Sequence, residues 1–233
     1  MLKPRKKITR KELKRDPLLE ILYTLRQWWV ANKKTVSRYG GLALIIVILS
    51  VLVFRWRATL NEKAAAVAGI AHIEFSNGNY NTVIATLGDV VEEYSGLKSF
   101  GNGLYLLARS ELYVQDTLNA EIHYRLYLDE YGKDPLLKSG AYAALGLIEE
   151  GRDNYFESAE LFRKAGQSAP TTKLVYQYSI YSGRNYLLAS QPKETLSILQ
   201  PLLDNIELDY QVSSEIQELI ATARYLMEED DGV

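Results

Sequence analysis

The sequence predicts an all-α protein in which one membrane-spanning helix precedes a solenoid of helical hairpins. Three observations support this prediction. A single uncharged apolar run extends from Gly40 to Phe54. Basic residues gather before this run, and acidic residues follow it. Beyond residue 61, two-helix patterns recur with a period of 37 to 38 residues and no alternating strand pattern interrupts them.

The apolar run is close to the length that a bilayer requires. With Tyr39 it has 16 residues, or about 24 Å at a rise of about 1.5 Å per residue, against a hydrocarbon core of about 30 Å. Long basic side chains on both flanks can reach the interface. We therefore predict a signal-anchor helix over residues 38–57, in contact with lipid through residues 39–54. The expected interface residues are Trp28, Trp29, Arg38, Tyr39, Arg55, Trp56 and Arg57.

Two alternatives to this anchor remain. The run is also compatible with a buried helix of a soluble domain or with a cleaved signal peptide. A cleavage site calls for small residues, whereas Arg55, Trp56 and Arg57 follow the run directly.

Charge predicts the orientation of the anchor. Twelve Lys or Arg and three acidic residues give residues 1–38 a net charge of +9, whereas residues 58–233 carry −13. Segments that stay in the cytoplasm retain Lys and Arg. The N-terminus is therefore expected in the cytoplasm and the C-terminal domain in the periplasm, with the anchor in the inner membrane.

The segment before the anchor has two parts. Residues 1–15 are expected to form a basic disordered tail, and residues 16–35 an amphipathic helix that begins with Asp16 as N-cap and Pro17 at its first position. Apolar residues at helical spacing and nearby tryptophans suit the inner-leaflet interface. The basic charge is also compatible with nucleic acid. The topology rule explains it without a nucleic-acid partner, and ribosomal RNA or a cytosolic protein remains a secondary alternative.

Beyond the anchor, small residues mark each repeat. They stand at Ala71, Ala108, Gly146 and Gly183, at intervals of 37, 38 and 37 residues. Sixteen positions later come Leu87, Tyr124, Phe162 and Leu199. Polar turns are expected at 76–80, 114–117, 151–155 and 190–193. A small residue lets the second helix of a hairpin approach closely, and the later residue fills the space between the helices. Because one hairpin cannot bury both faces, several must stack.

The third repeat resembles the tetratricopeptide (TPR) consensus. The matching residues are Tyr142, Leu145, Gly146, Tyr155, Phe162, Ala165 and Pro170. Glu149 and Ser158 depart from the consensus, which usually has an aromatic residue and Ala there. The resemblance implies a TPR-like solenoid over residues 61–227, with about four hairpins, longer turns between them and a capping helix from Gln211 to Met227. Residues 228–233 then form an acidic tail. The alternative is a chance period in an irregular helical domain.

The sequence contains none of the common catalytic or metal-binding motifs, and we expect no enzyme activity, no cofactor and no small-molecule substrate. Two pairs could be drawn as metal ligands: Glu74 with His72, and Glu121 with His123. Two residues do not make a site, so these side chains are interpreted as exposed helical polar residues.

In a TPR-like stack, the first helix of each hairpin lines a concave face. That register implies a partner-binding groove formed by His72, Phe75, Tyr105, Arg109, Tyr113, Leu147, Glu150, Gln177 and Arg184. Rigid aromatic side chains with a polar tip suit contact with peptides. The alternative is that many of the tyrosines only pack between helices. The Lys and Asn set with which some TPR domains clamp a C-terminal carboxylate is not reproduced.

The whole layout resembles the bacterial ancillary subunit of the Sec translocon, a family with one signal anchor and a periplasmic TPR-like domain. The resemblance implies a non-enzymatic adaptor whose partners are translocon subunits, a periplasmic chaperone or translocating polypeptides. The cytoplasmic segment is longer here than in that family and has its own amphipathic helix. A scaffold for another envelope complex, in cell division, wall synthesis or secretion, is the alternative, and an accessory subunit of a membrane enzyme is a third.

Overall fold

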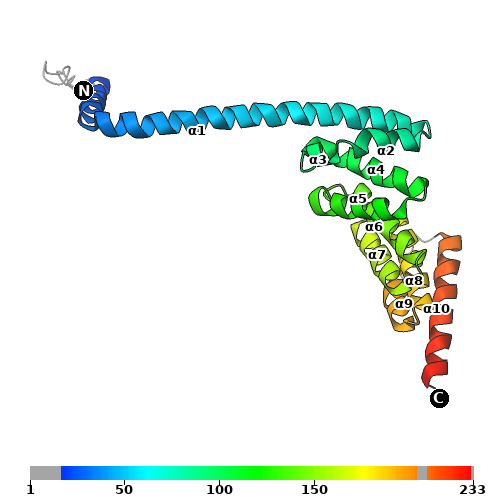
Figure 1. Cartoon of the computed structure of the whole chain (residues 1–233). Coiled ribbons are helices and arrows are strands. Elements are labelled where there is room, and N and C mark those ends of the chain that lie inside the picture. The colour runs from blue at the N-terminus through cyan, green and yellow to red at the C-terminus, as the bar shows by residue number, and fades with distance from the viewer. Residues whose placement is uncertain (1–16, 204–208, 232–233) are drawn as a thin grey trace, which may run out of the picture. The chain divides into compact units, whose positions relative to one another are not determined.

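A computed structural model describes residues 17–203 and 209–231, and all regular structure in these residues is helical (Figure 1). This confirms the all-α prediction. The predicted basic tail at 1–15 lies outside the described residues. The elements are α1 (Pro17–Ser76), α2 (Tyr80–Gly88), α3 (Val91–Tyr94), η1 (Lys98–Phe100), α4 (Gly101–Tyr113), α5 (Thr117–Glu130), α6 (Pro135–Glu150), α7 (Tyr155–Ser168), α8 (Thr172–Leu188), α9 (Pro192–Leu199), η2 (Gln200–Leu202) and α10 (Tyr210–Asp231).

The chain divides into two compact units, Met1–Ala58 and Thr59–Val233. Helix α1 has 60 residues and continues through the predicted break between the segments 16–35 and 38–57. The reason is local, because residues 35–39 contain no proline. Gly40 and Gly41 each cost about 1 kcal/mol relative to Ala, but they keep the N–H groups that continue the helical hydrogen bonds.

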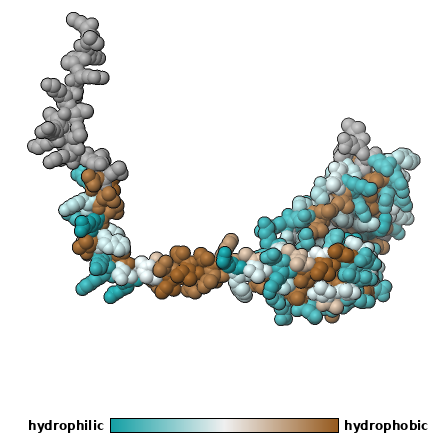
Figure 2. Space-filling model, turned by 90° about the horizontal axis from the view of Figure 1, so that it is seen from above, coloured by the Kyte–Doolittle hydropathy of each residue, from teal (hydrophilic) through white to brown (hydrophobic). Residues whose placement is uncertain are grey.

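The apolar part of α1 has the properties of a membrane span. Between Leu19 and Ser76 the most apolar stretch reaches a mean hydropathy of 2.2, and none of it is buried, unlike the core helix of a soluble domain. Figure 2 shows it as a continuous hydrophobic band. Length and composition therefore allow this helix to cross a bilayer. The seven predicted interface residues, Trp28, Trp29, Arg38, Tyr39, Arg55, Trp56 and Arg57, all lie on α1 and are exposed.

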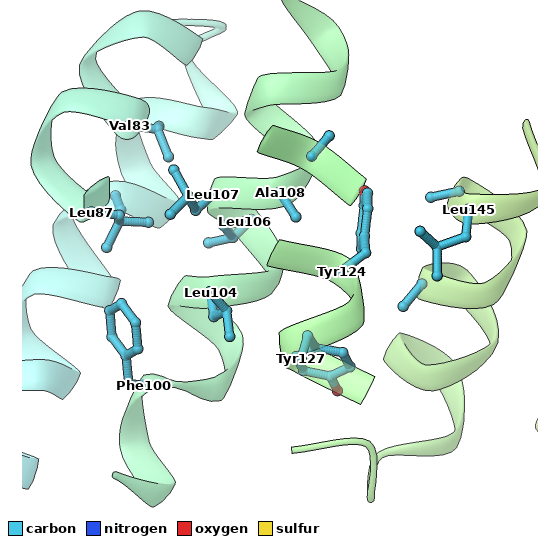
Figure 3. Packing of buried hydrophobic residues seen from close by; sticks show 14 of the residues in the cluster. Val83, Leu87, Phe100, Leu104, Leu106, Leu107, Ala108, Tyr124, Tyr127 and Leu145 are labelled. Carbon is cyan, nitrogen blue, oxygen red and sulfur yellow. The ribbon is translucent and has the colours of Figure 1, made fainter. Parts of the chain in front are cut away.

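In the second unit, each helix packs mainly on its neighbours along the chain. Helix α2 packs on α4, then α4 on α5, α5 on α6, α6 on α7, α7 on α8, and α8 on α9. Buried side chains of α2, α4, α5 and α6, among them Leu87, Leu107, Tyr124 and Leu145, form one continuous core (Figure 3). The stability of this unit therefore comes from contacts between successive helices.

Four turns between helices share one backbone geometry. Each has one residue in the left-handed region: Gly78 (φ 80°), Gln115 (φ 65°), Asp153 (φ 61°) and Ser190 (φ 56°). At each turn the next residue donates its N–H to the carbonyl five positions earlier, as from Asn79 to Glu74 at 2.9 Å. This is the Schellman closure of a helix C-terminus. The left-handed residues follow the small residues at a constant distance of seven, so the predicted turns are where the sequence places them.

The small residues serve the close approach that their spacing predicts. A Cβ atom added at Gly146 would lie 3.1 Å from the Phe162 ring, and one at Gly183 would lie 2.7 Å from Leu199. The corresponding residues of the first two pairs, Ala71 with Leu87 and Ala108 with Tyr124, are buried. Each pair is separated by sixteen residues, as the sequence indicates.

The structure alters the expected C-terminal boundaries. The helix predicted from Gln211 to Met227 is longer, because α10 continues to Asp231 through most of the predicted acidic tail. No glycine or proline interrupts it before Gly232. Ile216 and Ile220 of α10 pack in a cluster with Ile180 and Leu199, so the helix covers the end formed by α8 and α9.

Candidate functional site

A groove of about 630 Å³ lies along the side of the second unit where α4, α6 and α8 follow one another. These are the first helices of three successive helix–turn–helix segments. Its lining residues are Tyr105, Arg109, Leu112, Tyr113, Tyr124, Leu136, Leu137, Gly140, Ala143, Ala144, Leu147, Phe162, Leu174, Gln177, Tyr178 and Tyr181. Small and aliphatic residues of α6 therefore form the middle of the groove, and tyrosines of α4 and α8 flank them.

Tyr105 forms one wall and is held by aromatic contacts. Its ring meets those of Tyr124 and Tyr127 edge to face, with centroids 5.7 and 5.5 Å apart. A Cβ atom at Gly140 would clash with the Tyr105 hydroxyl, so the absence of a side chain at this position lets the end of Tyr105 lie close to α6. Burial raises the pKa of Tyr105, although the charge of Arg109 opposes the shift. The phenol therefore stays protonated at neutral pH and can donate a hydrogen bond.

Arg109 is the only charged residue in the lining of this groove. Its guanidinium carbon lies 5.0 Å from the Phe75 ring centroid and 5.7 Å from that of Tyr113. Tyr80 stacks on Tyr113 at 4.5 Å and completes this aromatic support. Among the described residues Arg109 has no carboxylate partner. Burial alone would lower the pKa of its guanidinium, but the hydrogen bond that it donates to the Tyr113 hydroxyl and the other nearby tyrosines outweigh this effect, so the pKa is raised. The groove thus presents one positive charge that is held in place and not neutralised.

The structure brings together five of the nine predicted groove residues. Tyr105, Arg109, Tyr113, Leu147 and Gln177 line the groove. Phe75 is outside the lining and supports Arg109 from α1.

The other three predicted residues lie elsewhere. His72 is exposed on α1. Glu150 accepts a hydrogen bond of 3.2 Å from the side-chain amide of Asn185. Arg184 pairs with Glu215 of α10 at 2.7 Å, which neutralises its charge.

Sequence reasoning missed a second groove of about 630 Å³, between α8 and α10. Gln177 and Tyr181 line both grooves, while Tyr176, Ile180, Arg184, Val212 and Glu215 belong to the second. The sequence predicted α10 as a capping helix, but no repeat relates it to the other helices, so the groove that it forms with α8 could not be inferred from the period. Tyr181, by contrast, stands four positions after Gln177 on one helical face, and this spacing was a usable signal.

The tyrosines divide between the two interpretations that the sequence allowed. Tyr124, Tyr127 and Tyr186 are almost fully buried and pack between helices. Burial, together with the nearby Asp134, raises the pKa of Tyr127 to about 12. Tyr105, Tyr113, Tyr178 and Tyr181 are less buried and line the groove, which the buried Tyr124 also reaches. Several tyrosines therefore support the core while others form the candidate binding surface.

The interpretation of His123 as an exposed polar residue was wrong. Its Nδ1 lies 2.7 Å from a carboxylate oxygen of Glu111, and the two side chains are 17 and 4% exposed. The partner is Glu111 on α4 and not Glu121, because the antiparallel packing of α4 and α5 brings distant residues together. The described residues contain no group of three or more potential metal ligands.

Comparison with models of known protein families, with characterised proteins and with solved structures gives no match for this chain. The groove and the apolar helix are therefore the features of this chain that bear on its function.

Proposed function

We propose that the chain is a non-enzymatic, membrane-anchored adaptor that binds a segment of another protein in the groove of its second unit. The observation that carries this proposal is the composition of the groove. Tyrosines and aliphatic residues, mainly from α4, α6 and α8, line it, and Arg109 is the only charged residue in this lining. Such a surface suits an extended, largely apolar segment that brings one carboxylate to Arg109.

The repeat geometry supports a TPR-like assignment for this unit. Four turns share the Schellman closure, and close helix contacts recur at Gly146 and Gly183. In TPR-like stacks the first helices line the concave face, and α4, α6 and α8 line the groove here. The proposal therefore includes a solenoid of about four hairpins, with α10 as its cap.

The proposed location follows from charge and from the resemblance to the ancillary Sec translocon subunit. The segment before the anchor carries +9 and the part after it −13, which favours a cytoplasmic N-terminus and a periplasmic groove. We propose translocon subunits, a periplasmic chaperone or translocating polypeptides as the partners.

A photo-crosslinking amino acid at Leu147 tests the groove directly. Leu147 is 53% exposed and lies in the lining, so a bound segment comes within reach of the probe. In the full-length protein, Arg109→Glu is expected to reduce the crosslinked partner at least about tenfold, because loss of a central charged anchor costs about 2 kcal/mol or more. Lys164→Glu makes the same charge change at an exposed position of α7 and is expected to leave capture unchanged. Equal capture by both variants would remove the assignment of the groove.

The identity of the crosslinked protein tests the proposed partners. Translocon subunits, a periplasmic chaperone or a translocating polypeptide would support the adaptor role. Recovery of division, wall-synthesis or secretion-apparatus proteins would replace it with the scaffold role.

A further inference from the structure

The first helix of the second unit has an apolar face that no described residue covers. Ala66, Gly69, Ile70 and Ile73 of α1 are all exposed, and the two isoleucines are 56 and 61% exposed. Residues at this spacing lie on one side of a helix. The opposite side of α1 carries Ala64, Ala68 and Ala71, which are buried against the rest of the unit. We call the four exposed residues the end face.

The repeat shows what covers such a face elsewhere in the chain. Counted from the small residues, Ile70 corresponds to Leu107 and Leu145, which are 0 and 2% exposed, and Ile73 corresponds in the third repeat to Ile148 at 4%. The residues equivalent to Ala66 and Gly69 are also buried in α4 and α6: Gly103, Ala141, Leu106 and Ala144. In those helices a preceding helix packs on this side. Gly103, for example, lies against Ala68 of α1. In the other repeats the equivalent face is buried under the preceding helix. The end face has the same apolar character, but no described helix precedes it.

Gly69 is a second, independent observation. It lies inside α1, where glycine costs about 1 kcal/mol relative to Ala. No heavy atom lies within 4 Å of an added Cβ at this position, and its φ is not in the left-handed region. No contact among the described residues calls for a glycine here. A glycine on an exposed helical face does explain the close approach of another helix.

We propose that the end face binds the end face of a second copy of this chain, so that two α1 helices pack side by side in parallel. This inference rests on the proposed membrane anchor. Copies anchored in one membrane hold their α1 helices in the same direction, so that Gly69 and Ile73 of each copy meet their counterparts at the same height. Confinement to the membrane also raises the effective concentration of the partner.

The described part of the chain offers no other cover for this face. No side chain of residues 17–203 or 209–231 packs on Ile70 or Ile73, which stay 56 and 61% exposed. Residues 1–16 lie on the other side of the bilayer in the proposed topology. Glu62 and Lys63 stand about one turn before the end face, so each copy also supplies an acid and a base to the contact.

The absence of cysteine from the sequence allows a direct test by disulfide crosslinking. Full-length Ala66→Cys and Ile73→Cys proteins in native membranes are expected to form a covalent dimer on mild oxidation. His72→Cys, exposed on a different side of the same helix, is the matched control and is expected to remain largely monomeric. In the Ala66→Cys background, Gly69→Leu is expected to reduce the dimer about tenfold, because it blocks close approach of the helices.

Each outcome decides the proposal. A dimer that forms at Ala66 and Ile73 and depends on Gly69 supports it. Equal crosslinking at His72, no crosslinking at any position, or crosslinking at Ile73 only to a different protein overturns it. Membrane sedimentation and groove capture are measured on the same samples. If the protein sediments with membranes and captures its partner but forms no dimer, only self-association fails. If it leaves the membrane fraction, the proposed function fails.

Discussion

At the scale of single residues, the helix contacts depend on two glycines whose missing side chains are occupied by neighbours. Gly146 faces Phe162, and Gly183 faces Leu199. The sequence predicted both pairs from their spacing of sixteen residues. It could not predict the partners of His123 or Arg184, because Glu111 and Glu215 have no fixed spacing from them and are brought near only by packing.

Gly183→Ala is expected to destabilise the second unit by about 1–3 kcal/mol, because overpacking forces a well-packed core to shift. The added Cβ would lie 2.7 Å from Leu199, a fully buried side chain. Gly88→Ala is the matched control, since nothing lies within 4 Å of its added Cβ. Chemical denaturation of both variants measures the difference. Equal stability would show that α8 and α9 are not packed as described.

The ion pairs of Glu121 are expected to make the folded chain less stable in acid. Burial raises the pKa of its carboxyl, but hydrogen bonds from Arg152 and Arg125 outweigh this effect, so the pKa is lowered from 4.5. The carboxyl of Glu121 therefore binds a proton more readily in the unfolded chain than in the folded one. Its ion pairs stabilise the fold fully at pH values above the pKa of the unfolded state, and this stabilisation is lost as the pH falls through the pKa of the folded state.

Glu121→Gln is accordingly expected to lower the unfolding free energy at neutral pH by at most about 1 kcal/mol, given the exposure of its partners. Its unfolding free energy should also fall less than that of the wild type between about pH 5 and about pH 3. Glu157→Gln, at an exposed position of α7, serves as control. The same pH profile in all three proteins would contradict the role of this ion pair.

At the scale of elements, the shared backbone geometry of the four turns explains why the repeat keeps its period although different residues occupy equivalent positions. Only the first has glycine in the left-handed position, whereas Gln115, Asp153 and Ser190 adopt it against their preference. Polar composition predicted the turns, and the absence of breakers between residues 35 and 39 explains why α1 is longer than expected. The sequence predicted α10 as a capping helix, but its extension to Asp231 and the groove it forms with α8 have no counterpart in the period and were found from the structure.

Gln115→Gly is expected to stabilise the second unit by about 1 kcal/mol, because glycine adopts the left-handed conformation without steric cost. Gly78→Ala, the reverse change at the equivalent turn, is expected to destabilise it by a similar amount, about 1 kcal/mol. Thermal unfolding of the two variants checks the signs. A shift of the same sign in both would mean that the turns are not equivalent.

At the scale of the whole molecule, the proposal joins an apolar helix that can cross a membrane to a groove that can bind protein. The sequence predicted the apolar helix and five of the groove's lining residues. It did not predict that Glu215 of α10 neutralises Arg184, or that Arg109 packs on the ring of Phe75. Both contacts join residues from different helices, and only the packing of those helices brings them together. The central claim is that the groove stands on the far side of the membrane from the basic N-terminal segment.

Labelling of single cysteines from outside the cytoplasm tests that claim most directly. Lys33→Cys and Lys164→Cys lie on either side of the apolar run, and both positions are exposed. A membrane-impermeant maleimide added to intact spheroplasts is expected to label Lys164→Cys at once and Lys33→Cys only after the membrane is permeabilised. Labelling of Lys33→Cys in intact spheroplasts, with Lys164→Cys protected until permeabilisation, would contradict the account.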